Sequence, residues 1–106
     1  MELIVLKQAK RELMDAPKDI ITDVFALFDD LMAGKSLGMP ISRPLPSIAK
    51  GLHELRLSGI GGEYRVFYVI RTADAIYVLH ATPKKKQEID RRTADLLRLR
   101  ARRIGL

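Results

Sequence analysis

The sequence predicts an α+β fold, in which helices pack against a small antiparallel sheet. Apolar residues recur at helical spacing through the first third of the chain, and three strand-like runs separated by short gaps follow after residue 50. A stretch rich in lysine, arginine and leucine then closes the chain. The length of 106 residues is that of one domain, so we expect a single domain over residues 1–106.

The N-terminal third is expected to form two helices in a hairpin. Residues 3–6 are a short apolar run, which suits either a first strand added to the sheet or the start of a helix. We predict helices over residues 6–15 and 17–33, because Pro17 suits the first turn of a helix but breaks an interior one. Residues 34–50 contain three prolines and are expected to form a connecting loop.

Three strands and a final helix are expected in the second half of the chain. The strands cover residues 52–58, 63–71 and 75–82, and the short gaps between them predict a three-stranded antiparallel meander. Pro83 ends the third strand, because proline has no backbone N–H to donate to the ladder. A basic C-terminal helix is then expected over residues 84–103.

The positive charge is concentrated at the C-terminal end. Residues 1–83 hold 10 Lys/Arg and 10 Asp/Glu, whereas residues 84–106 hold nine Lys/Arg and three Asp/Glu, so the last segment carries the whole net charge of +6. Such a segment indicates a polyanion or an acidic protein as partner. The plain alternative is a solvated helix face that keeps the protein in solution.

Several classes of protein are excluded by what the sequence lacks. There is no cysteine, so a disulfide framework, a Cys-ligated zinc site and a thiol nucleophile are excluded. No apolar run approaches the ~20 residues that span a bilayer, and the N-terminus does not resemble a signal peptide, so we expect a cytoplasmic protein without a membrane partner. His53 and His80 are the imidazoles available, and no residue spacing is typical of a metal site, so neither a metal nor a cofactor is expected.

The first predicted hairpin places two arginines opposite each other. If Ser58 pairs with Glu63, then Arg56 lies opposite Arg65 on one face of the sheet. Like charges directly opposite each other destabilise a sheet, so this arrangement invites an explanation.

The second predicted hairpin extends this row. If Arg71 pairs with Asp74, then Arg65 lies opposite His80, and three lysines, residues 84–86, emerge just past the same strand end. Together these side chains would form a concave basic pocket suited to a phosphodiester. The other face is more apolar and is expected to be the core face; it carries Leu55, Leu57, Val66, Tyr68, Ile70, Tyr77 and Leu79.

Each of these residues also has a structural interpretation. Arg56 and Arg65 could form ion pairs with Glu54, and His80 could be a hydrogen-bonded core histidine. The lysines could be a solvated run before a helix. It is the convergence of these residues on one face that favours a functional interpretation.

Four segments of the chain resemble the RelE/ParE superfamily of type II toxins, nearest its phage-derived, HigB-like branch. They read GLHELR, EYRVFY, IYVLHA and KKKQ, and they cover residues 51–56, 63–68, 76–81 and 84–87. The resemblance extends over about residues 3–103 and includes the helix pair before the sheet.

This resemblance implies a RelE-like fold and an endoribonuclease that cuts mRNA on the translating ribosome. It also implies a cognate helix-turn-helix antitoxin that neutralises the toxin, with operator DNA reached only through the toxin–antitoxin complex. By the same resemblance Arg65 matches the arginine that binds the scissile phosphate, and the lysines supply further cations. Related toxins often have a catalytic Tyr, or an Asp/His pair, near the C-terminus, and His80 is the candidate here because the chain after Lys86 contains no Tyr and no His.

These considerations define a set of candidate site residues. The catalytic candidates are Arg65, His80, Lys84 and Lys85. The RNA-binding candidates are Arg56, Lys86, Arg91 and Arg92.

Two other functions are compatible with the same sequence. A ParE-like toxin would inhibit DNA gyrase and leave mRNA intact. A catalytically inactive basic domain would bind nucleic acid or an antitoxin, with an affinity that collapses as the salt concentration rises.

Overall fold

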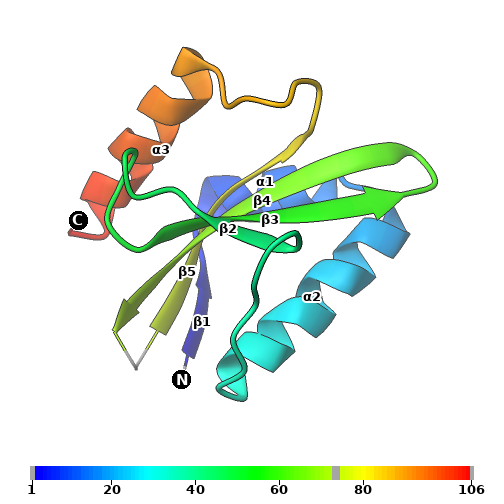
Figure 1. Ribbon diagram of the computed structural model, residues 1–106, viewed down its shortest axis with the longest axis horizontal. Coiled ribbons are helices and arrows are strands. Elements are labelled where there is room, and N and C mark those ends of the chain that lie inside the picture. The colour runs from blue at the N-terminus through cyan, green and yellow to red at the C-terminus, as the bar shows by residue number, and fades with distance from the viewer. Residues whose placement is uncertain (1, 73–74, 106) are drawn as a thin grey trace.

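The computed structural model describes residues 2–72 and 75–105 and has an α+β fold built on a five-stranded mixed sheet (Figure 1). The strand order is β1-β5-β4-β3-β2; β1 runs parallel to β5, and the other neighbouring pairs are antiparallel. In chain order the elements are β1 (Glu2–Val5), α1 (Lys7–Met14), α2 (Lys18–Met32), β2 (Ser42–Pro44), β3 (Leu52–Gly59), β4 (Gly62–Thr72), β5 (Ala75–Pro83) and α3 (Arg91–Arg103).

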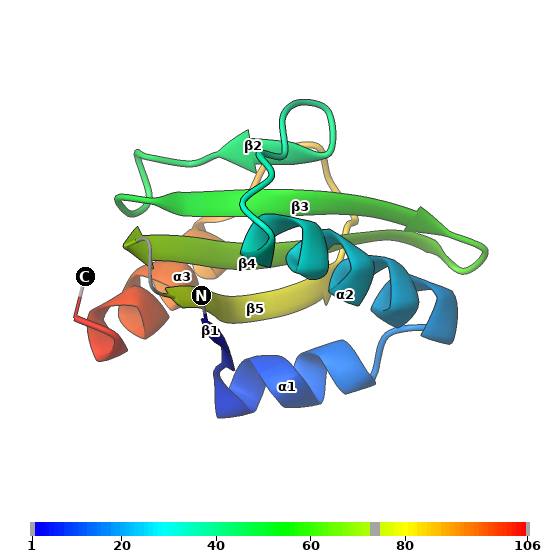
Figure 2. The ribbon, with the colours of Figure 1, turned by 90° about the horizontal axis from the view of Figure 1, so that it is seen from below.

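Helices cover both faces of the sheet. Helices α1 and α2 pack on one face and α3 packs on the other; Figure 2 shows α2 in front of the sheet and α3 behind it. The first two helices end and begin within a residue or two of their predicted limits, with Pro17 directly before α2. None of the helices in the described part of the chain is long and apolar enough to cross a membrane.

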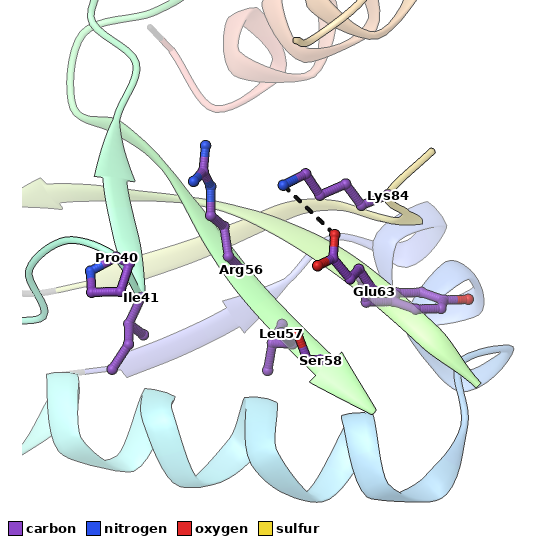
Figure 3. A pocket seen from close by; sticks show the side chains of 8 residues that line it. Pro40, Ile41, Arg56, Leu57, Ser58, Glu63 and Lys84 are labelled. Atoms are coloured by element: carbon purple, nitrogen blue, oxygen red, sulfur yellow. Dashed lines mark ion pairs between the residues drawn. The ribbon is translucent and has the colours of Figure 1, made fainter. Parts of the chain in front are cut away.

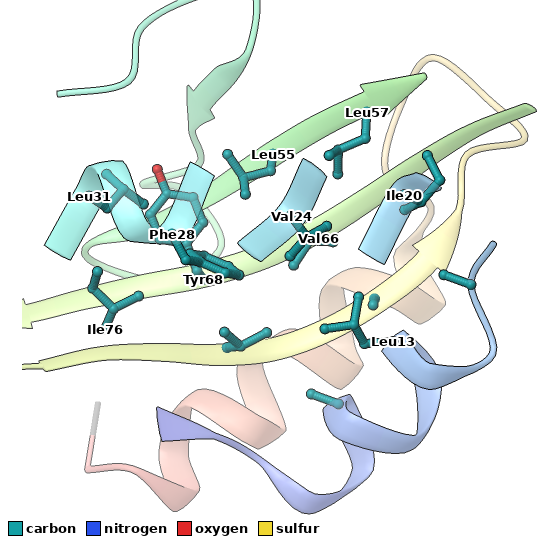
Figure 4. Close-up of a cluster of buried hydrophobic side chains, with 14 residues drawn as sticks. Leu13, Ile20, Val24, Phe28, Leu31, Leu55, Leu57, Val66, Tyr68 and Ile76 are labelled. Atoms are coloured by element: carbon teal, nitrogen blue, oxygen red, sulfur yellow. The ribbon is translucent and has the colours of Figure 1, made fainter. Parts of the chain in front are cut away.

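Each face of the sheet has its own hydrophobic core. The first core lies between the sheet and the two N-terminal helices (Figure 4), and it includes Leu13, Ile20, Val24, Phe28, Leu55, Leu57, Val66 and Tyr68. The second core lies under α3 and consists of Leu45, Leu52, Phe67, Val69, Leu79, Leu97 and Ala101. The expectation of a single core face is therefore wrong, because α3 covers the apolar part of the second face.

The sheet is larger than the predicted three-stranded meander. The apolar run at residues 3–6 forms most of β1, which pairs with β5 in parallel. A short strand, β2, lies inside the predicted loop and places Arg43 opposite Glu54 of β3. Three residues are too short a strand for an alternation pattern to reveal, so the sequence carries no clear signal for β2.

The C-terminal helix begins later than predicted. Residues 84–90 form an irregular loop, and α3 starts at Arg91. Asp90 is the N-cap of this helix, since its Oδ1 accepts a hydrogen bond from the backbone N–H of Thr93 at 2.7 Å.

The β3–β4 ladder has the predicted register, with Arg56 opposite Arg65. The predicted pairing of Arg65 with His80 is wrong, because Arg65 lies opposite Thr82 and His80 lies opposite Phe67. The hairpin pair that was expected to set this register includes Asp74, which lies outside the described residues.

The β4–β5 ladder contains two irregularities. It is shifted between Phe67 and Tyr68 and again near the hairpin. After the first shift, Val78 lies opposite Tyr68 in the first core, whereas Tyr77 and Leu79 pack in the second core. The bulge therefore places Tyr77 and Leu79 on the face opposite to the one predicted for them.

Candidate functional site

A fully buried carboxylate on β3 holds three arginines together. Glu54 is 0% exposed, and its Oε1 lies 3.0 Å from Arg56 Nε and 3.4 Å from Arg43 Nη2. Its Oε2 lies 2.9 Å from Arg65 Nε; this contact is an ion pair rather than a directed hydrogen bond, because the N–H does not point at the oxygen. Guanidinium groups from β2, β3 and β4 thus share one carboxylate, which leaves an excess of two positive charges.

Arg65 is engaged on all of its nitrogen atoms. Besides the ion pair with Glu54, its Nη2 donates to the carbonyl oxygen of Gln87 at 2.8 Å and to that of Lys86. Its Nη1 donates to the carbonyl oxygen of Glu88 at 3.4 Å. The structural interpretation of Arg65 that the sequence left open, an ion pair with Glu54, is confirmed.

The predicted lysines lie in the segment 84–90, which we call the lysine loop. The Lys84 side chain is only 9% exposed; its Nζ lies 3.7 Å from Glu63 Oε2 and 3.4 Å from Gln87 Oε1. Lys85 and Lys86 are exposed. One lysine is therefore held against the sheet, while the next two are free to contact a ligand.

Two neighbouring pockets lie around these cations. The first has a volume of about 260 Å³ and is lined by Arg56, Glu63, Tyr64 and Lys84 among others. Figure 3 shows Arg56 and Lys84 on the same side of the hairpin, with the Glu63 carboxylate beside Lys84. The second pocket, of about 240 Å³, is lined by residues that include Arg65, Thr82, Lys85, Lys86 and Asp90.

The arrangement is suited to an extended anion that carries more than one charge. Guanidinium and ammonium groups bind phosphate oxygens through charge-assisted hydrogen bonds. The first pocket also holds a carboxylate, Glu63, which is 56% exposed and therefore within reach of a ligand. Within residues 2–72 and 75–105, no three His, Cys, Asp or Glu side chains are grouped as metal ligands would be.

His80, on β5, lies outside both pockets and belongs to a separate charged cluster. Its Nδ1 is 2.8 Å from Glu12 Oε1 and 3.2 Å from Arg100 Nη1, and its ring stacks on Phe67 with centroids 5.8 Å apart. Arg100 binds Glu12 with both Nη atoms, at 2.7 and 3.0 Å, and donates to the carbonyl oxygen of Leu79. This cluster joins α1 and α3 across β5.

The cluster changes the acidity of its carboxylate. Burial raises the pKa of Glu12, but hydrogen bonds from Arg100 and His80 outweigh that effect and hold the pKa below its ordinary value of 4.5. Glu12 is therefore ionised at neutral pH and provides the negative charge for both partners.

The remaining predicted residues lie at the start of α3. Arg91 and Arg92 are exposed and line neither pocket, and Arg91 Nε lies 4.0 Å from Asp95 Oδ2. Nearby, hydrogen bonds from Thr93 lower the pKa of the Asp90 carboxyl. These two arginines extend the basic surface without belonging to the pockets.

Sequence reasoning missed several residues of these clusters. They are Arg43 beside Glu54, Glu63 in the first pocket, and the pair formed by Glu12 and Arg100. Arg43 depends on the short strand β2, and the Glu12–Arg100 pair joins residues 88 positions apart, so neither has a local signal. Glu63 had a signal, its place one residue before the tyrosine and two before the arginine of the YRVFY strand.

The chain is similar to one protein family and to a solved structure. The family model described as "Phage derived protein Gp49-like" matches residues 11–102, which include every residue that lines the two pockets. No curated protein matches the chain. The crystal structure of the intact E. coli RelBE toxin-antitoxin complex is similar with a TM-score of 0.48 and 14% identity, and the match covers 79% of this chain and 96% of that chain.

Proposed function

The chain belongs to the Gp49-like family of phage-derived proteins, and from this premise we propose that it is the toxin of a toxin–antitoxin pair that cuts mRNA. The match confirms the expected relationship to the phage-derived branch of the RelE/ParE superfamily. The observation that carries the proposal is the gathering of Arg56, Lys84, Lys85 and Lys86 around two neighbouring pockets.

RNA cleavage suits a site that is rich in cations. The 2′-hydroxyl attacks the adjacent phosphorus, the bond to the 5′-oxygen breaks, and the products are a 2′,3′-cyclic phosphate and a 5′-hydroxyl. Negative charge builds up on the non-bridging oxygens during this step, so correctly placed ammonium and guanidinium groups lower the barrier.

We assign the phosphate contacts to Lys85 and Lys86, which are exposed, and to Arg56 and Lys84 at the first pocket. The proton of the 2′-hydroxyl passes to Glu63, the one carboxylate among the described residues that line that pocket, and the leaving 5′-oxygen takes a proton from solvent. The Lys84 ammonium, 3.7 Å from Glu63 Oε2, forms an ion pair with this carboxylate at the pocket.

We assign no proton transfer to His80. Its Nδ1 is occupied by Glu12 and Arg100, and its ring lies outside both pockets. Its proposed role is to join β5 to the two helices. Arg91 and Arg92 are proposed to contact RNA further along the strand.

An antitoxin is the second proposed partner. The resemblance to type II toxins supports a cognate helix-turn-helix protein that binds this chain, neutralises it and connects it to operator DNA. The excess of positive charge in residues 84–106 suits an acidic segment of such a protein as well as RNA. The ribosome, which holds the mRNA, is the proposed setting of the cut.

Induced expression in a bacterial host tests this function. The wild type, a Lys85→Ala/Lys86→Ala variant and a matched control, Lys35→Ala, are induced, and mRNA 5′ ends are mapped within minutes. Lys35 is an exposed lysine beyond α2 and lines neither pocket. We expect new 5′ ends inside translated codons for the wild type and the control, and their loss in the double variant or with the antitoxin co-expressed.

The same experiment identifies the rival functions. Growth arrest with intact mRNA contradicts the nuclease and favours a gyrase inhibitor. A folded protein that causes no arrest favours a domain that only binds.

A further inference from the structure

Arg65 lies beneath the lysine loop. It contributes to the floor of the second pocket, yet the residue is only 5% exposed. Its nitrogen atoms face four oxygen acceptors: the Glu54 carboxylate and the carbonyl groups of residues 86, 87 and 88. The hydrogen bonds of this guanidinium, made by Nη1 and Nη2, and its ion pair with Glu54 are therefore all directed at the protein.

The lysine loop is attached at both ends and, between them, to Arg65. At its start the backbone N–H of Lys84 donates to the carbonyl oxygen of Glu63 at 2.8 Å. At its end Ile89 packs against the second core, and Asp90 caps α3. Residues 85–88 between these points are exposed and have no regular secondary structure, so three consecutive carbonyl contacts to one side chain set their path.

We propose that Arg65 is a positioning residue, which fixes the lysine loop so that Lys85 and Lys86 are presented to the RNA, and that it is not itself a phosphate ligand. This inference rests on the proposed function for the identity of the ligand. A phosphate that bound Arg65 would have to displace three carbonyl groups and compete with a buried carboxylate. Lys85 and Lys86 are already exposed, so the same phosphate reaches them without such a loss.

The chemistry of arginine suits this role. A guanidinium is a planar fork with five N–H donors, so it binds several carbonyl groups and a carboxylate together. An ammonium at the same position keeps the charge but not this geometry. Holding the loop in advance removes part of the entropy cost of ordering two lysines when RNA binds.

Amide hydrogen exchange of residues 86–89 in the free protein tests the anchoring. Arg65→Lys is compared with the wild type and with a matched control, Arg56→Lys, since Arg56 shares the Glu54 carboxylate but lines the other pocket. We expect exchange at least about tenfold faster in Arg65→Lys and unchanged in Arg56→Lys. Equal exchange in the wild type and Arg65→Lys would overturn the proposal.

A double-mutant cycle separates positioning from direct contact. The probe is a 2′-O-methyl RNA oligonucleotide, which binds but cannot be cut. Arg65→Lys is expected to weaken binding at least about fivefold in the wild type and less than about twofold in the Lys85→Ala/Lys86→Ala background, because its effect passes through those lysines. A direct ligand loses the same factor in both backgrounds, so equal factors contradict positioning.

The wild type alone provides a third measurement, in case Arg65→Lys does not fold. At saturating oligonucleotide, the side-chain NMR signals of Lys85 and Lys86 are expected to shift while the Arg65 Nε–H signal stays in place. A shift of the Arg65 signal with loss of loop protection refutes the proposal.

Failure of the inference and failure of the proposed function give different results. If the wild type binds no RNA but Arg65→Lys loosens the loop, the anchoring role stands and the nuclease does not. If RNA is bound and cut while the loop exchanges equally in all variants, the nuclease stands and the anchoring role does not.

Discussion

Glu54 is the residue that holds the basic surface together. Its carboxylate is fully buried among three guanidinium groups, so its loss leaves these cations close to one another without a counter-charge. We expect Glu54→Gln to lower the free energy of unfolding by about 3 kcal/mol, measured by urea denaturation. The control, Glu2→Gln, changes an exposed carboxylate and should cost less than about 0.5 kcal/mol. Equal losses in the two variants would show that the three arginines do not depend on Glu54.

Glu12 gives the stability a pH dependence. Because its pKa is lowered in the folded protein, the stabilisation is fully present above its ordinary pKa of 4.5 and is lost as the pH falls through the lower folded value. We expect Glu12→Gln to cost about 2 kcal/mol at pH 7. The stabilities of the two proteins should converge as the pH falls through that lower value, and a difference that stays constant in strong acid contradicts the ion pair.

At the scale of elements, the tip of the β3–β4 hairpin rests on the start of α2. The backbone N–H of Ile60 donates to Asp19 Oδ2 at 3.1 Å, and a Cβ added at Gly59 would lie 2.6 Å from that oxygen and 2.9 Å from Ile20 Cδ1. We expect Gly59→Ala to destabilise the fold by about 1–3 kcal/mol in thermal or urea denaturation. Gly61→Ala is the matched control, since its Cβ meets its nearest neighbour at an ordinary 3.5 Å, and a larger loss there would contradict the packing described.

The elements differ in how far local sequence determines them. The register of β3 with β4 was predictable, because a tight glycine-containing turn leaves little freedom in pairing. The register of β4 with β5 was not predictable, because this ladder contains a bulge at Phe67 and Tyr68, and neither residue type indicates a bulge.

The start of α3 shows how a tertiary contact overrides local preference. Lys, Gln and Glu at residues 84–88 favour a helix, so the sequence predicted one. In the structure the carbonyl groups of residues 86–88 bind Arg65 from β4 instead, and the helix begins only after its N-cap, Asp90. The capping residue was visible in the sequence, whereas the contact with Arg65 required the fold.

At the scale of the whole molecule, the region that holds the candidate site was predictable from the sequence. The contacts between its residues were not. The excess charge after residue 83 and the Arg56–Arg65 pair pointed to the end of the sheet around which the two pockets lie. The separation of His80 from that region depends on the shifted ladder and on partners from two distant helices. Long-range contacts of this kind have no periodicity by which sequence reasoning could find them.

The distribution of charge over the whole chain predicts how RNA binding depends on salt. Residues 1–83 are neutral, and the cations assigned to phosphate contacts are Arg56 and Lys84–Lys86. These four contacts to a single strand are expected to make log K fall with log salt at a slope of about −3, which Arg91 and Arg92 make steeper where the oligonucleotide reaches them; fluorescence anisotropy with the 2′-O-methyl oligonucleotide measures it. The Lys85→Ala/Lys86→Ala variant should reduce the slope by about 1.4. A slope that the double variant leaves unchanged means that the RNA binds elsewhere.

The central claim is that this basic surface cuts mRNA, and a reconstituted reaction tests it most directly. Purified protein is added to ribosomes that translate a defined mRNA, and the RNA ends are analysed in a single turnover. The account predicts cuts inside translated codons that leave 5′-hydroxyl ends, with activity lost in Lys85→Ala/Lys86→Ala and kept in Lys35→Ala. Intact mRNA in the presence of the folded wild type, or equal cutting by the double variant, would contradict it.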